Sequence, residues 1–304
     1  MANWQGVYPA VLTQFRADES LDIAATQTEI DRLVADGVDG VVALGTSGEN
    51  FTLDGPEKHA LLAAIVETVA GRVPVLAGIA EYSTPAGAAL ASEAEAMGAA
   101  GLMVVPGLVY KSGRAEILAH FRTIAQASRL PVMIYNNPGT YGSDMAPDVI
   151  AELAGDARFC AAKESSGELA RCVSLHETLG GDFAIFCGAD DIVLDMVAAG
   201  AVGWISGFIN AFPSESVAMF HAARAGRSVQ ARALFDWFAP ILALDSRPTL
   251  VQCLKLAASM QGRGTATVRG PRLALDAAEL SEVASIIEAA MATRPVLGNS
   301  AAAK

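Results

Sequence analysis

The sequence predicts a (β/α)8 barrel, the TIM-barrel fold, followed by extra helices. Short apolar runs alternate eight times with amphipathic stretches, and the connections between them are too short to separate domains. Runs such as Val132-Met133-Ile134 carry no polar face, which is typical of parallel strands covered by helices. An open nucleotide-binding sheet is the rival fold. It requires a GxGxxG turn after the first strand, where this chain has Val11-Leu12-Thr13-Gln14-Phe15.

Apolar runs that end in turn-forming residues give the eight predicted strands. They cover residues 7–12, 38–43, 73–78, 100–105, 131–135, 158–163, 183–187 and 202–206.

Amphipathic stretches between these runs give the predicted helices. Asp54 and Thr84, each followed closely by a proline, are typical helix starts, and Gly98 and Gly200 are typical helix ends. The predicted helices cover about 22–36, 54–70, 84–97, 114–128, 146–154, 167–179, 190–199 and 213–223.

Three more predicted helices exceed what a barrel needs, at about 227–243, 247–260 and 276–292. We therefore expect a barrel over residues 1–224 and a helical extension over 225–293 that packs on the barrel. The remaining residues, 294–304, show no periodicity and are predicted to be a disordered tail.

The composition limits the possible partners and compartments. The chain is 52% hydrophobic, yet no apolar run reaches the ~18 residues of a membrane helix, and the start MANWQGVYPA lacks the basic region of a secretory signal. A net charge of -12, with only 21 Lys and Arg residues, argues against nucleic acid or an anionic membrane as a partner. We expect a cytoplasmic protein that acts on a small molecule.

The sequence predicts no metal site and no cofactor. The four histidines and four cysteines show no metal-ligand spacing, and the cysteines are expected to be buried free thiols. Asp190 and Asp191 are the carboxylates that a metal-assisted aldolase could recruit. We interpret them instead as the cap of a helix that begins near Ile192.

The chemistry of such a barrel lies at the carboxyl ends of its strands, and Lys163 is the most informative residue there. Apolar residues run directly into it, so its amine should lie inside the barrel mouth. Burial lowers the pKa of a lysine amine below its usual value of about 10.4, and the neutral amine attacks carbonyl or imine carbon to form a Schiff base. An ion pair with Glu164 is the competing interpretation.

Other strand ends carry groups that Schiff-base chemistry needs. Tyr135, at the end of the preceding predicted strand, can transfer protons, with Thr46 and Tyr110 as further relay candidates. Thr46 and Ser47 lie in a turn flanked by glycines, where hydroxyls and backbone amides can bind a carboxylate. A tyrosine and a lysine that end successive strands form a much stronger signal than the glycine spacing.

The motifs GTSGEN, IYNNPG, AAKESSG and SGFIN together resemble, in order, those of the dihydrodipicolinate synthase and N-acetylneuraminate lyase superfamily. This resemblance spans about residues 6 to 260. It implies that Lys163 forms the Schiff base, that Tyr135 transfers protons, and that Thr46 and Ser47 bind the substrate carboxylate. It also implies a homotetramer built as a dimer of dimers, and no cofactor. The predicted substrate-binding set is Thr46, Ser47, Gly48, Ile205, Ser206 and Gly207.

Within this superfamily the chain looks most like the branch that contains pyrroline-4-hydroxy-2-carboxylate deaminase. The synthase of lysine biosynthesis has an arginine shortly after its YNxP motif, and this chain has Gly139-Thr140-Tyr141 there. The tyrosine after the fourth strand also lies farther along than in the synthase, which puts the relay role of Tyr110 in question. The synthase or a related 2-oxo-acid aldolase is the alternative. A phosphosugar barrel and a catalytically silent ligand-sensing barrel remain as rivals from other classes.

Overall fold

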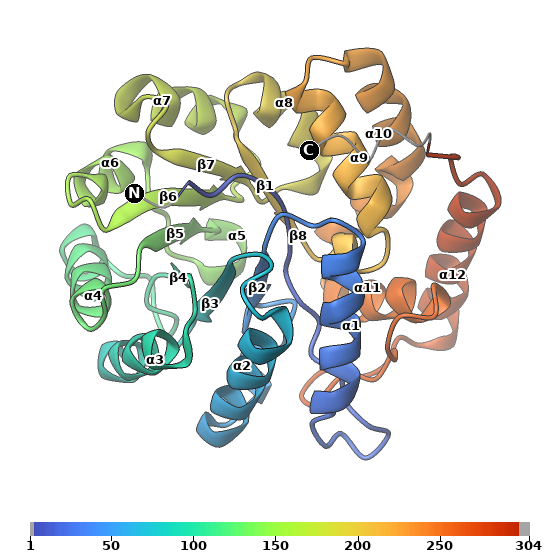
Figure 1. The fold of residues 1–304 in the computed structure, drawn as a ribbon, viewed down its shortest axis with the longest axis horizontal. Helices are drawn as coiled ribbons and strands as arrows, with labels where there is room; N and C mark the ends of the chain where they lie inside the picture. The colour runs from blue at the N-terminus through green and yellow to red at the C-terminus, as the bar shows by residue number, and fades with distance from the viewer. Residues whose placement is uncertain (1–2, 298–304) are drawn as a thin grey trace.

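The computed structural model describes residues 3–297 and confirms the predicted (β/α)8 barrel with additional helices (Figure 1). All strand pairs are parallel, in the order β1-β8-β7-β6-β5-β4-β3-β2. A parallel bridge between Ala10 and Val42 brings the two ends of the sheet together. The strands are β1 (Gly6–Pro9), β2 (Val41–Ala43), β3 (Val75–Ile79), β4 (Gly101–Val104), β5 (Val132–Asn136), β6 (Phe159–Glu164), β7 (Ala184–Cys187) and β8 (Gly203–Ser206).

Helices surround the strands where the sequence predicts them. They are α1 (Ile23–Ala35), α2 (Gly55–Val69), α3 (Thr84–Met97), α4 (Arg114–Gln126), α6 (Pro147–Ala154), α7 (Leu169–Leu179), α8 (Val193–Ala198) and α9 (Pro213–Arg224). Four short elements have no counterpart in the prediction: α5 (Pro138–Tyr141) and the 3-10 turns η1 (Asn50–Thr52), η2 (Asp190–Ile192) and η3 (Phe208–Asn210). They follow strands β5, β2, β7 and β8, at the end of the barrel where chemistry is expected.

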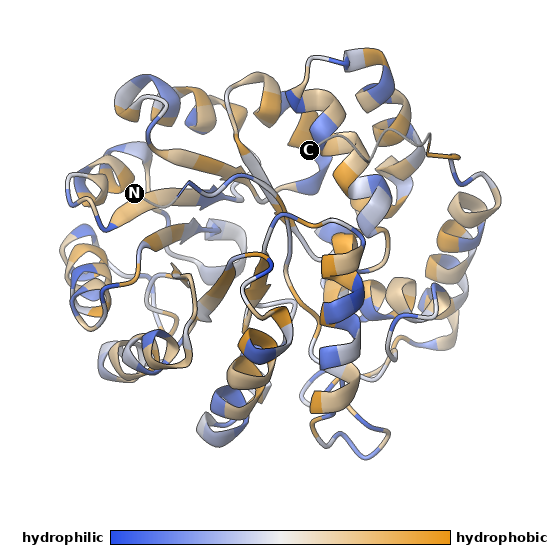
Figure 2. Cartoon of the chain, in the orientation of Figure 1, coloured by the Kyte–Doolittle hydropathy of each residue, from blue (hydrophilic) through white to orange (hydrophobic). Residues whose placement is uncertain are grey.

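Two apolar layers form the core. One lies between the strands and the helices and includes Val132, Ile134 and Ala162, whereas the other lies inside the barrel and includes Met133 and Tyr135. Successive residues of β5 thus face opposite sides, as the pleat of a strand requires. Figure 2 shows the hydrophobic colouring of the strands and of the helix faces that cover them. This alternation determines which strand residues reach the barrel mouth.

The C-terminal helices are α10 (Ser228–Leu242), α11 (Leu250–Met260) and α12 (Ala277–Ala292), with the 3-10 turn η4 (Ala243–Ser246) between the first two. They lie on the side of the barrel that carries β1 and β8 (Figure 1). The division of the chain after residue 224 stays a prediction. Arg294, at the start of the predicted tail, donates to Glu215 at 2.6 Å, and residues 298–304 lie outside the described part.

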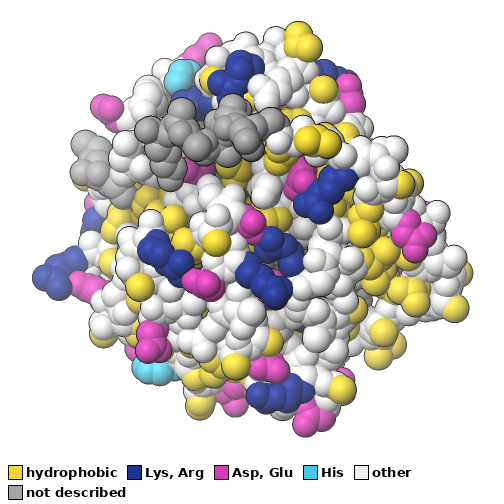
Figure 3. Space-filling view, turned by 45° about the vertical axis from the view of Figure 1, so that its right-hand side comes forward, with side chains coloured by type: hydrophobic (Ala, Val, Ile, Leu, Met, Phe, Trp, Pro, Cys, Tyr) yellow, Lys and Arg dark blue, Asp and Glu magenta, His cyan; other side chains and the backbone are white. Residues whose placement is uncertain are grey.

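The surface shows no cluster of one charge on the face beside these helices, where basic, acidic and apolar side chains are interspersed (Figure 3). Within residues 3–297, no helix is both long and apolar enough to span a bilayer.

Candidate active site

Lys163 and Tyr135 lie side by side in the barrel mouth. They are register partners on β6 and β5, and the Lys163 amine lies 4.1 Å from the centre of the Tyr135 ring. Both side chains are buried, with exposed fractions of 7% and 5%. The Lys163 amine makes no ion pair with any carboxylate among residues 3–297. Its nearest described partner is therefore the face of a phenol, which leaves the nitrogen available to a substrate.

Glu164 does not pair with Lys163, because adjacent strand residues face opposite sides of the barrel wall. Its carboxylate accepts from the Asn136 amide at 3.0 Å and from the Ser166 backbone N–H at 2.7 Å. Asn136 in turn accepts from Met145 N–H at 3.0 Å. This outer pair links β5 to β6 directly behind the two inward residues. Burial raises the pKa of Glu164, an effect that these hydrogen bonds partly oppose.

Replacement of Glu164 by glutamine should change how stability depends on pH. Because the pKa of Glu164 is raised in the folded state, the folded protein binds more protons than the unfolded chain between the two pKa values. This carboxyl therefore makes the free energy of unfolding fall as pH rises from its unfolded pKa through its folded pKa. Urea unfolding of both proteins at a series of pH values measures the difference. A difference that stays constant with pH would contradict the assignment.

Gly188, in the loop after β7, leaves the space that the Lys163 side chain occupies. A Cβ atom at this position would lie 2.5 Å from Lys163 Cε and 1.9 Å from Ser165 Oγ. Neither contact is sterically possible without movement. Glycine at this position thus fixes the path of the lysine stem into the mouth.

The variant Gly188→Ala should fold but lose most of its activity, because the added methyl group displaces Lys163. A shift of about 1 Å at a reacting atom costs on the order of 10²-fold in rate. Steady-state kinetics measure the loss, and circular dichroism checks the fold. The matched control is Gly181→Ala, since a Cβ there would meet nothing within 4 Å. Equal activity of the two variants would contradict this account of Gly188.

The turn after β2 presents Thr46 and Ser47, both half-buried, at the mouth. It is bounded by Leu44 and Glu49, whose φ angles of 55° and 56° place them in the left-handed region. Non-glycine residues rarely adopt this conformation, and where they do, surrounding contacts hold them. Here Gly48 packs so closely that a Cβ would lie 2.7 Å from the carbonyl oxygen of Val11.

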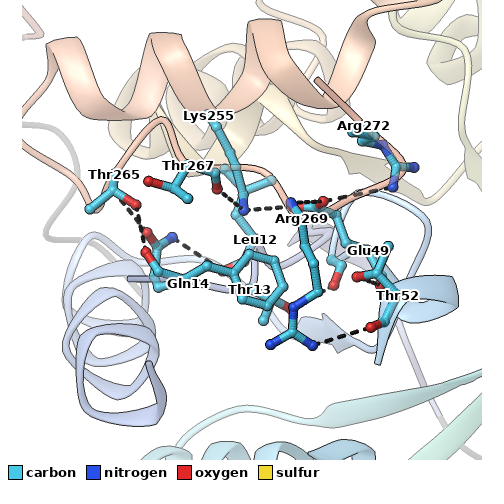
Figure 4. Close-up of polar contacts among 12 residues, drawn as sticks. Leu12, Thr13, Gln14, Glu49, Thr52, Lys255, Thr265, Thr267, Arg269 and Arg272 are labelled. Carbon is cyan, nitrogen blue, oxygen red and sulfur yellow. Dashed lines mark hydrogen bonds and ion pairs between the residues drawn. The ribbon is translucent and has the colours of Figure 1, made fainter. Parts of the chain in front are cut away.

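Glu49 anchors this turn to the C-terminal helices through a fully buried ion pair. Its carboxylate lies 2.5 Å from the Lys255 amine of α11, and both side chains have an exposed fraction of 0%. Lys255 also donates to the Thr267 carbonyl at 2.6 Å, and Arg269 N–H donates to Glu49 at 3.1 Å (Figure 4). Burial lowers the pKa of Lys255, and the charge of Glu49 opposes this effect. The helical extension therefore positions the turn that carries Thr46.

The loop after β5 places an unpredicted residue, Tyr141, beside Thr46. The two hydroxyl groups form a short hydrogen bond, and the Tyr141 ring meets the Tyr135 ring edge-on at 5.5 Å. Tyr110, which the sequence suggested for this place, is 61% exposed and donates to Glu116 at 3.1 Å. Within one chain, Tyr110 is therefore not brought to Tyr135. The second tyrosine of the quoted YNNPGTYG motif was the only sequence signal for Tyr141.

The end of β8 forms another side of the mouth. Ser206 is buried, and its hydroxyl donates to Asp190 at 2.6 Å and accepts from Phe208 N–H at 3.1 Å. Its side chain is thus already engaged. Gly207 is closely packed, since a Cβ there would lie 2.4 Å from a methyl carbon of Leu254, and Ile205 belongs to the apolar layer inside the barrel.

Asp190 does not cap a helix, so that interpretation was wrong. Its carboxylate accepts from Trp204 Nε1 at 2.9 Å and from Ser206, because the loop after β7 folds as a 3-10 turn whose cap is Ala189. Asp245, in η4, is a second acidic group near the lysine that the sequence did not suggest. Burial raises the pKa of Asp245, and the positive charge of Lys163 opposes this rise.

Within residues 3–297, no cluster of His, Cys, Asp and Glu side chains has the arrangement of a metal site. The four cysteines are buried and unpaired.

Comparison with known proteins agrees with this geometry. The model of the dihydrodipicolinate synthetase family matches residues 3–290. A 4-hydroxy-tetrahydrodipicolinate synthase of Methanoculleus marisnigri is 33% identical over 93% of this chain and 98% of its own length.

Solved structures show the same fold over nearly the whole chain. A putative dihydrodipicolinate synthetase from Pseudomonas aeruginosa has a TM-score of 0.90 and 31% identity, covering 95% of this chain and 100% of that one. YagE, a prophage protein of the same family from E. coli K12 in complex with pyruvate, has a TM-score of 0.91 and 29% identity, covering 95% and 99%. The chain belongs to the dihydrodipicolinate synthetase family and is a class I lyase, the type that acts through a lysine Schiff base.

Proposed function

We propose that the protein deaminates and dehydrates pyrroline-4-hydroxy-2-carboxylate, giving 2-oxoglutarate semialdehyde and ammonia. Lys163 attacks the ring C=N carbon, and the ring nitrogen leaves as a primary amine while the chain keeps the new imine. Loss of the 4-hydroxyl group as water and hydrolysis of both carbon–nitrogen bonds complete the reaction. The observation that carries the lysine step is the buried Lys163 amine, which lies over the Tyr135 ring and is not ion-paired within the described residues.

The substrate has one carboxylate, and one anion site at the mouth suffices for it. Thr46 and Ser47 supply hydroxyl and backbone donors at a turn held by buried contacts. Helix α5 places Tyr141, an uncharged side chain, next to this turn, in the segment where the resemblance implies an arginine in the synthase. The carboxyls of Asp190 and Asp245 lie on the other side of Lys163 and disfavour a second substrate carboxylate there.

The alternative is the condensation of pyruvate with aspartate semialdehyde. The names of the similar curated proteins favour it, since the M. marisnigri relative is a 4-hydroxy-tetrahydrodipicolinate synthase. Both reactions begin with the same lysine step, so they differ only in how the second half of the substrate is bound.

We propose in addition that the protein is a cytoplasmic homotetramer without a cofactor. Exposed apolar side chains at the start of α3 and in the loop after β4, namely Tyr82, Val109 and Tyr110, provide a surface for another copy. Light scattering coupled to size-exclusion chromatography measures the assembly. A monomer at micromolar concentration would refute it.

A substrate panel tests the proposed reaction. The purified enzyme is incubated with pyrroline-4-hydroxy-2-carboxylate, and the release of ammonia is followed. In parallel, pyruvate and aspartate semialdehyde are supplied and the consumption of pyruvate is followed. We expect ammonia release and no condensation. Condensation without ammonia release would assign the synthase reaction instead, and activity that persists in a chelator is expected for either reaction.

A further inference from the structure

Tyr141 occupies a place in the site to which no role has been given. It ends α5, where the Asn137 side chain accepts from Thr140 N–H at 3.0 Å and thereby fixes the turn over the barrel mouth. Only 9% of Tyr141 is exposed. Its hydroxyl bonds to Thr46 Oγ1, and its ring packs edge-on against Tyr135 at an interplanar angle of 88°. The phenol therefore lies between the proton-transfer candidate and the half-exposed turn.

The surroundings of Tyr141 keep its phenol protonated. Burial raises its pKa well above the ordinary value, and the charge of an ionised Tyr135 together with a hydrogen bond to Tyr135 raises it further, while the bond with Thr46 opposes the rise. A phenol held neutral cannot serve as a stable base. It can pass a proton only by giving one to Tyr135 while it receives one from Thr46.

We propose that Tyr141 is a positioning residue that joins Tyr135 to Thr46 in a proton relay contained within one chain. The proposal rests on the lysine chemistry of this site. A neutral amine and a carbonyl or cyclic imine consume one proton when they form a protonated Schiff base, and this proton leaves with the oxygen as water or with the ring nitrogen as an amine. Tyr135 delivers it, Tyr141 replaces it, and Thr46 replaces that of Tyr141 with a proton from solvent.

Two donors then converge on the Tyr135 oxygen at the moment it becomes a phenolate. One is the Tyr141 hydroxyl, and the other is the Asn137 amide, which lies 3.3 Å away. Both come from the same segment, residues 137–141. Donors fixed in advance at a developing negative charge stabilise it without reorganisation. The segment after β5 therefore serves Tyr135 as a preformed support.

Tyr141→Phe tests the relay, because it removes only the hydroxyl and keeps the ring packing. We expect kcat to fall by about 10²-fold with little change in KM, an altered solvent deuterium isotope effect and an unchanged thermal midpoint. Thr46→Val interrupts the same path, so Thr46→Val/Tyr141→Phe should reduce kcat no further than the more severe single variant does. Tyr82→Phe, at an exposed tyrosine outside the site, is the matched control and should behave as the wild type.

Borohydride trapping separates failure of the relay from failure of the lysine chemistry. If the wild type is trapped on Lys163 and Tyr141→Phe retains a normal kcat, the relay is refuted and the lysine step stands. If Tyr110→Phe alone loses activity, the relay runs through a tyrosine of another copy, and the intrachain proposal is equally refuted. If the wild type is not trapped, both proposals fail.

Discussion

Replacement of Lys163 by methionine is expected to abolish turnover, with a loss of about 10⁴-fold or more, while the protein stays folded. Methionine fills nearly the same volume and retains contact with the Tyr135 ring, since its thioether packs well against aromatic faces. The variant lacks the nitrogen that forms the Schiff base. The folded state should tolerate the change, because the amine makes no ion pair within residues 3–297 that the substitution could break.

Mass spectrometry after reduction with borohydride in the presence of pyruvate checks the assignment. A reduced adduct should map to the peptide that contains Lys163 in the wild type and be missing from Lys163→Met. Lys58, which is ion-paired with Glu81 at 2.6 Å, is the internal control and should stay unmodified. An adduct on any other lysine, or turnover by Lys163→Met, would move the Schiff base away from β6.

The sequence predicts the inner half of this site well, because strand ends are set by local rules. Apolar runs and the turn residues after them place Lys163 and Tyr135 at the ends of β6 and β5, and the structure makes them register partners. The period of two along a strand is enough to turn Glu164 away from Lys163. Applied earlier, that same period would have removed the Glu164 ion pair from consideration.

The outer half of the site depends on features that leave little trace in a sequence. Helix α5 has only 4 residues, so no amphipathic period could reveal it, and Tyr141 comes into place through its cap at Asn137. Asp190 accepts bonds from β8 across the barrel and does not cap a helix, because a 3-10 turn intervenes. Such positions follow from tertiary packing, which overrides local capping preference.

The second large effect is expected at the buried pair of Glu49 and Lys255. Glu49→Leu removes the carboxylate and leaves the Lys255 ammonium with the Thr267 carbonyl and the face of Phe15, 4.4 Å from the ring centre. An uncompensated buried charge costs about 3–5 kcal/mol in the free energy of unfolding. Chemical unfolding followed by circular dichroism measures this loss.

The double variant Glu49→Leu/Lys255→Met is the matched control, because it removes both charges and keeps apolar side chains of similar length. Replacing a whole buried pair is often neutral for stability, so the double variant should recover most of what Glu49→Leu loses. Its activity should nevertheless stay low, since the turn bearing Thr46 has lost its link to α11. Recovery of both stability and activity would show that the pair contributes only to folding. Recovery of neither would show that packing of the pair, and not its charge balance, holds the turn.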